Sequence, residues 1–153
     1  MGSILDLRST NWSYYTVPIA FMLVMVPHAY SIVLAGKNYD LDSPRRTEDL
    51  CAKDTSLGKA VLRRISRAKA ASANGFETLG LYAAGVVAAN VAQVETEAVN
   101  KLALTYLVSR AVYNFVYVHL QDNKRMAPIR SLVWLVSLYA IFALFVKAGI
   151  QIN

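Results

Sequence analysis

The feature that most constrains this chain is a set of four long apolar stretches that carry few or no charges. They cover residues 16–36, 70–94, 98–120 and 131–149. Each approaches the roughly 20 residues that a helix needs to cross about 30 Å of hydrocarbon. With 153 residues, 56% of them hydrophobic, the chain is too apolar for an ordinary soluble domain. The sequence therefore predicts an all-α fold, in which residues 1–153 form one integral membrane domain, a four-helix bundle.

Lysine and arginine are distributed unevenly, and their distribution predicts which loops stay in the cytosol. The loops 37–69 and 121–130 hold 12 of the 16 basic residues. Because such residues are retained on the cytosolic side of a membrane, both loops are expected there, with the termini on the opposite side. The net charge of +6 then follows from topology, and no nucleic-acid partner is expected. The single cysteine, Cys51, excludes an internal disulfide and offers no metal cluster.

Several polar side chains fall inside the predicted spans, where ionisable groups are costly and are therefore candidates for function. Asn74 and Glu77 share one face of the second span, since residues three or four apart are neighbours on a helix. Arg110, Tyr113 and Tyr117 form a similar stripe on the third span. At about 1.5 Å per residue, the two stripes overlap in depth near the cytosolic face. They form either a polar pocket that opens to the cytosol, or a Glu77–Arg110 ion pair that only fixes helix register.

Three motifs carry a resemblance to a known family. They are Arg67-Ala68 followed by Asn74-Gly75-Phe76-Glu77-Thr78, then Arg110-Ala111-Val112-Tyr113 with Tyr117, and then Arg125-Met126-Ala127-Pro128-Ile129-Arg130-Ser131. In their order and spacing they resemble the membrane-associated proteins in eicosanoid and glutathione metabolism, the MAPEG family, which includes microsomal glutathione transferases and prostaglandin E synthase. The resemblance covers about residues 60–150.

The resemblance implies a homotrimer in the endoplasmic reticulum membrane, with glutathione bound between subunits and a lipophilic small-molecule substrate arriving from the lipid bilayer. An arginine at the start of the fourth helix would stabilise the glutathione thiolate, because a guanidinium stays charged and favours an anionic sulfur. The resemblance favours Arg130 for this role and leaves Arg125 as the alternative, with Ser131 beside it. The residues implied to bind glutathione are Asn74, Glu77, Arg110, Tyr113, Tyr117 and Arg67.

One departure from the family pattern bears on function. Ala70 stands where many members carry a second arginine, so one cationic contact to the glutathione carboxylates is missing. Three functions remain open at this point. The first is a glutathione-dependent transferase, isomerase or peroxidase, the second a non-catalytic lipid-binding scaffold, and the third a glutathione-independent isomerase or cyclase of a specialised metabolite. No metal is expected in any of them.

Overall fold

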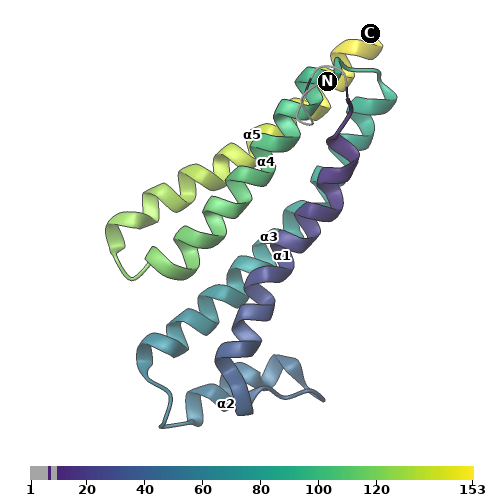
Figure 1. Ribbon diagram of the computed structural model, residues 1–153. Coiled ribbons are helices and arrows are strands. Elements are labelled where there is room, and N and C mark those ends of the chain that lie inside the picture. The colour runs from purple at the N-terminus through teal and green to yellow at the C-terminus, as the bar shows by residue number, and fades with distance from the viewer. Residues whose placement is uncertain (1–6, 8–9) are drawn as a thin grey trace, which may run out of the picture.

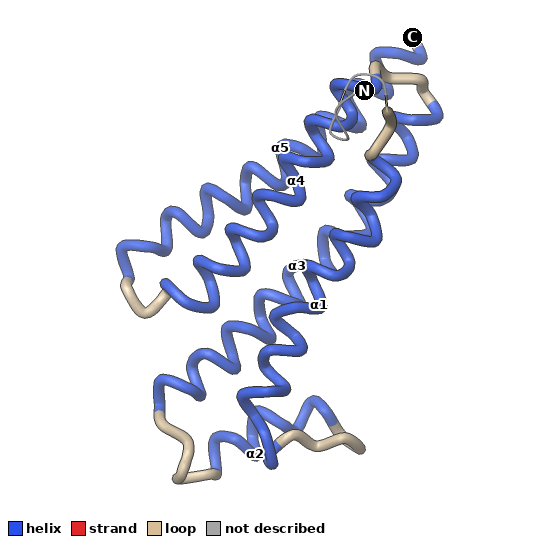
Figure 2. Tube along the Cα trace, viewed as in Figure 1, coloured by secondary structure: helices blue, strands red, loops and turns tan. Residues whose placement is uncertain are grey.

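The computed structural model describes Leu7 and residues 10–153, and every regular element in that part of the chain is helical. The prediction of an all-α fold is therefore confirmed. The long helices are α1 (Ser13–Ala35), α3 (Lys59–Val91), α4 (Thr96–Phe115) and α5 (Ala127–Ile152). The short elements are η1 (Gly36–Asn38), η2 (Pro44–Arg46), α2 (Thr47–Lys53), the π-helix η3 (Val116–Leu120) and η4 (Lys124–Met126). Figure 2 shows how the loops join these helices.

The long helices pack as two antiparallel pairs, α1 with α3 and α4 with α5. Figure 1 shows the pairs together where both chain termini lie, which we call the terminal end, and diverging toward the end that carries α2, the α2 end. The main core lies toward the terminal end, where four alanines allow close helix approach and two tyrosines lie among larger aliphatic side chains. Tyr82 and Tyr106 stack with ring centroids 3.8 Å apart, and the Tyr106 hydroxyl lies 3.2 Å from the Thr78 hydroxyl.

Within the described part of the chain, two helices are long and apolar enough to cross a bilayer by length and composition alone: α1 with its η1 extension, and α5. Their mean hydropathies are 2.0 and 2.1. The α3 and α4 helices carry more polar side chains, and their crossing of the membrane stays a prediction. In a helix every interior backbone group is paired within the segment, so such helices are suited to hydrocarbon.

The helix α3 begins at Lys59, well before residue 70, where the second apolar stretch starts. Residues 37–69 therefore contain α2 and the first turns of α3 rather than loop alone. The cause is that lysine, arginine, alanine and leucine are all good helix formers, so loss of hydrophobicity does not end the helix. The α2 helix is held in place because Cys51 packs with Ala35 and Ile65 in a small buried cluster.

A side chain from α4 compensates for a proline in α1. Pro27 has no N–H, so the carbonyl of Leu23, one turn earlier, loses its usual helical donor. The Asn114 Nδ2 donates to that carbonyl at 2.8 Å. This hydrogen bond connects the two helix pairs on the α2 side of the main core.

Candidate functional site

A cavity of about 470 Å³ opens between α3 and the α4–α5 pair. Six of the side chains predicted from sequence line it: Asn74, Glu77, Tyr113, Tyr117, Arg130 and Ser131. Ala70, Ala73 and Trp134 complete the lining. The two polar stripes and the start of α5 thus meet around one space.

Helix geometry explains how each wall of the cavity is built. Asn74 and Glu77 lie one turn apart on α3, with Ala70 a further turn away on the same face. Tyr113 lies in the last turn of α4, which ends at Phe115, and Tyr117 lies in the π-helix that follows. Their rings meet edge to face with centroids 5.6 Å apart. A single π-turn of this kind is rare and is frequently found at functional sites.

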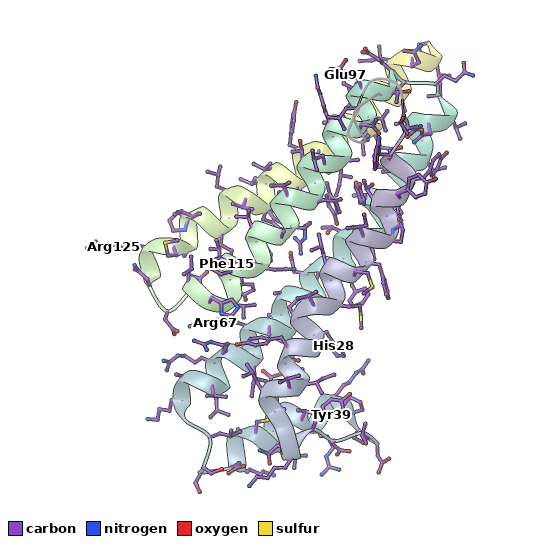
Figure 3. All side chains as sticks on the ribbon, in the orientation of Figure 1. His28, Tyr39, Arg67, Glu97, Phe115 and Arg125 are labelled. Carbon is purple, nitrogen blue, oxygen red and sulfur yellow. The ribbon has the colours of Figure 1, made fainter. Side chains whose placement is uncertain are left out.

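The structure distinguishes the two candidate arginines, Arg125 in η4 and Arg130 in α5. The guanidinium carbon of Arg130 lies 4.7 Å from the centre of the Tyr117 ring, a cation–π distance, and the side chain lines the cavity. Figure 3 shows Arg125 at the outer edge of the α4–α5 pair, pointing away from the other helices. Arg130 also lies in the first turn of α5, where unpaired backbone N–H groups favour an anion. Of the two, Arg130 is the cation that faces the cavity.

Arg110 lies behind the cavity rather than in its wall. Its side chain is only 2% exposed, and its Nη1 donates to the Asn74 Oδ1 at 3.0 Å. Asn74 in turn donates from Nδ2 to the Glu77 Oε2 at 3.4 Å. Asn74 therefore bridges Arg110 and Glu77, and the direct ion pair between them that the sequence left open is absent from the described residues.

Arg110 keeps unused hydrogen-bonding capacity. Its Nε and Nη2 are buried and have no hydrogen-bond partner among the described residues. Its guanidinium carbon lies 4.5 Å from the centre of the Tyr113 ring. A buried cation directly behind the lining makes the electrostatic potential in the cavity more positive, which favours an anionic ligand.

Arg67 is placed outside the cavity lining and is engaged elsewhere. Its Nη2 lies 2.8 Å from the Asp122 Oδ1, and the Nε of Arg63 lies 3.2 Å from the same oxygen. Hydrogen bonding to Arg67 lowers the pKa of Asp122 below its usual value, with Arg63 adding to the effect. These ion pairs connect the turn after η3 to the first half of α3, on the α2 side of the cavity.

Trp134 is a lining residue that the sequence reasoning did not single out. It lies four residues after Arg130 and therefore on the same face of α5. Its indole Nε1 is buried and has no partner in the part of the chain that the structure describes. The helical spacing from Arg130 is the signal that could have found it. Cys51 takes no part in this site, because it is buried under α3 and desolvation raises the pKa of its thiol.

Comparison with known proteins places the chain in a family. The model of the MAPEG family matches residues 8–150, which is nearly the whole chain. No curated protein and no solved structure gives a significant match. The family match agrees with the all-helical fold, the two strongly apolar helices and the motifs around the cavity. The chain belongs to the MAPEG family, whose members are membrane proteins of glutathione-related transferase and isomerase activity.

Proposed function

We propose that this protein is a glutathione-dependent enzyme that transfers, isomerises or reduces a lipophilic electrophile, and that glutathione binds in the cavity between α3, α4 and α5. The observation that carries this proposal is the position of Arg130. It is a permanent cation in the cavity wall, held over the Tyr117 ring at the start of a helix. Such a group stabilises a thiolate and lowers the pKa of the thiol toward neutral pH.

The remaining lining groups match the other charges of glutathione. The Glu77 carboxylate suits the ammonium group of the γ-glutamyl residue, and the Asn74 amide suits its peptide backbone. Behind the lining, the buried cation Arg110 favours negative charge in the cavity, and the hydroxyls of Tyr113 and Ser131 face carboxylates or the sulfur. Glutathione would therefore lie with its sulfur toward α5 and its amino group toward α3.

The chemical step follows from these placements. The thiol proton leaves to solvent and Arg130 holds the thiolate, whose electron pair then forms a bond to an electrophilic carbon or peroxide oxygen. The electron pair of the broken bond leaves with the displaced group, which takes up a proton. Holding both reactants in one site removes most of the entropic barrier, and the arginine supplies electrostatic stabilisation. Arg125 has no part in this step.

The assembly belongs to the same proposal. A homotrimer would bring a neighbouring subunit against the open side of each cavity. The many exposed apolar side chains on α1 and α5, among them Met22, Val33 and Phe142, leave ample surface for neighbours and lipid. We propose that the α2 end lies on the cytosolic side of the endoplasmic reticulum membrane, because this end carries most of the basic residues.

The first experiment is glutathione binding to the purified protein in detergent, by calorimetry together with ultraviolet detection of the thiolate. We expect Arg130→Ala to abolish the thiolate absorbance and to weaken binding about tenfold or more, since a hydrogen bond to a charged group contributes about 1.5–3 kcal/mol. Arg125→Ala is the matched control: it removes the same charge five residues earlier and should leave the thiolate signal unchanged. Light scattering of the same sample measures the number of subunits.

Two results would contradict the proposal. If glutathione at millimolar concentration does not bind the native chain, the cavity serves another ligand. If Arg125→Ala removes the thiolate signal and Arg130→Ala does not, the activating cation is the other arginine, and the side chains at the start of α5 rearrange in the assembled protein.

A further inference from the structure

A second groove, of about 590 Å³, runs along α4 and α5 and shares no lining residue with the glutathione cavity. Aliphatic side chains form most of its wall. They are Leu104, Val108 and Val112 from α4, and Val133 and Val136 from α5. Leu104, Val108 and Val112 are each about half exposed, so the groove is open along the outside of the helix pair.

The hydroxyl groups in this groove are already hydrogen-bonded to their own helix. The Thr105 Oγ1 donates to the Lys101 carbonyl at 2.8 Å, and the Ser109 Oγ donates to the Tyr106 carbonyl at 2.8 Å. These hydroxyl groups therefore need no hydrogen-bond partner from a molecule that binds in the groove. Hydrocarbon satisfies that condition, whereas a polar ligand would lose hydrogen bonds to water without replacing them.

The length of the groove matches one leaflet of a bilayer. Eleven helical steps separate Lys101 from Val112, about 17 Å at a rise of 1.5 Å per residue. The hydrocarbon core of a bilayer is roughly 30 Å thick, so one acyl chain covers about half of it. An acyl chain lying along α4 would therefore start at Lys101, at the terminal end, and finish near the middle of the membrane.

Lys101, at one end of the groove, also lines a smaller depression of about 340 Å³. Four charged side chains line it: Glu95, Glu97, Lys101 and Lys147. Lys101 Nζ lies 2.7 Å from the Glu97 Oε1. Among the described side chains, lysines and glutamates line the depression together, so it offers partners for both charges of a headgroup that carries both signs.

We propose that this groove is a binding site for one zwitterionic phospholipid whose headgroup ends in a primary ammonium. The acyl chain lies along Val108 and Val112, the phosphate meets Lys101 and Lys147, and the ammonium donates to the Glu95 carboxylate. Charge-assisted hydrogen bonds of this kind are about twice as strong as neutral ones, which gives the site a headgroup preference as well as an apolar wall. The site is separate from the proposed glutathione chemistry and does not depend on it.

The test is photolabelling of the intact protein in phosphatidylcholine nanodiscs. Trace phosphatidylethanolamine and trace phosphatidylglycerol, each with the same diazirine-bearing acyl chain, serve as probes, and labelled residues are mapped by mass spectrometry. We expect labelling at Val108, Val112 and Val133, about fivefold stronger with phosphatidylethanolamine, the ratio typical of one added charge pair at a membrane surface.

Substitutions then separate the headgroup from the chain. Glu95→Gln should remove the preference between the two probes, and Lys101→Gln should lower labelling by both. Asp49→Asn, which removes an acidic charge at the α2 end, is the matched control and should change neither. Val108→Trp should fill the groove and suppress labelling. The Lys101 and Glu95 variants change surface side chains, so the test does not depend on whether the Val108→Trp variant folds.

Three outcomes would overturn the proposal. The first is equal labelling by both probes in the native protein, with Glu95→Gln without effect. The second is labelling of the groove no stronger than that of Val33, an exposed residue of α1, which means bulk lipid only. The third is an unlabelled groove that instead crosslinks to another copy of the chain.

Discussion

At the scale of single residues, the cavity depends on side chains whose roles differ according to burial. Arg130 and Glu77 line the space, whereas Arg110 lies behind it and acts on it through Asn74. Burying a guanidinium in a membrane protein costs free energy, and losing a hydrogen-bond partner raises that cost. The hydrogen bond from Arg110 to Asn74 is therefore retained, and it holds the Asn74 amide in one orientation. Arg110 is therefore a positioning residue, and it orders the groups that face the amino end of the proposed ligand.

This role predicts coupling between Arg110 and Asn74. Arg110→Leu alone and Asn74→Ala alone should each weaken glutathione binding by about tenfold, the size of one hydrogen bond to a charged group. The double variant should be no weaker than Asn74→Ala, because the arginine acts through the asparagine. Calorimetric dissociation constants for the four proteins give the coupling energy. Additive losses would instead mean that Arg110 contacts glutathione directly.

At the scale of helices, the cavity owes its position to the close approach of α1 and α3. Gly75 lies next to Asn74 on α3, and a Cβ atom there would come within 2.6 Å of the Val24 Cγ2 and 3.1 Å of its Cγ1. Valine is β-branched and cannot easily turn away. The glycine therefore sets the depth at which α3 packs, and with it the place of Asn74 and Glu77.

We expect Gly75→Ala to destabilise the protein by about 1–3 kcal/mol, since overpacking forces the two helices apart. It should also weaken glutathione binding, because the shift carries Asn74 with it. Gly80→Ala is the matched control on the same helix: nothing lies within 4 Å of the Cβ it would add, and alanine favours a helix over glycine by up to about 1 kcal/mol. Thermal unfolding in detergent compares them. If Gly75→Ala melts no lower than Gly80→Ala, the contact with Val24 does not limit helix approach.

At the scale of the whole molecule, the two helix pairs diverge toward the α2 end (Figure 1), and ion pairs connect them there. Asp122, in the turn between α4 and α5, meets Arg63 and Arg67 on α3. This connection lies on the α2 side of the cavity and holds the start of α5, including Arg130, toward α3. Arg67 is thus a structural contact in this structure, whereas the sequence resemblance implied a glutathione ligand.

The connection should show a defined pH dependence. Because Arg67 lowers the pKa of Asp122, the stabilisation is present above the ordinary aspartate range near pH 4 and is lost as the pH falls through the lower pKa of the folded state. Asp122→Asn should therefore lower the melting temperature by about 1–2 °C at pH 7, and this difference should shrink as the pH falls below about 4. Asp49→Asn, which removes an exposed carboxylate on α2, should show neither effect. A difference that persists unchanged in acid would mean that the Asp122 charge does not supply the stabilisation.

The sequence alone determined the features that depend on neighbours along one helix. Long apolar stretches predicted the helices, and spacings of three and four residues placed Asn74 with Glu77 and Tyr113 with Tyr117. The motifs around them were enough to indicate the MAPEG family. These inferences needed only the period of an α-helix and the cost of polar groups in hydrocarbon.

Only the tertiary structure decided how those faces meet. It turned Arg130 into the cavity and Arg125 away, placed Asn74 between Arg110 and Glu77, joined Arg67 to Asp122, and added Trp134 to the lining. Local spacing shows which side chains share a face, but the rotation and depth of one helix against another depend on contacts between residues far apart in the chain. Gly75 against Val24 and Asn114 against the Leu23 carbonyl are such contacts, and they place the site.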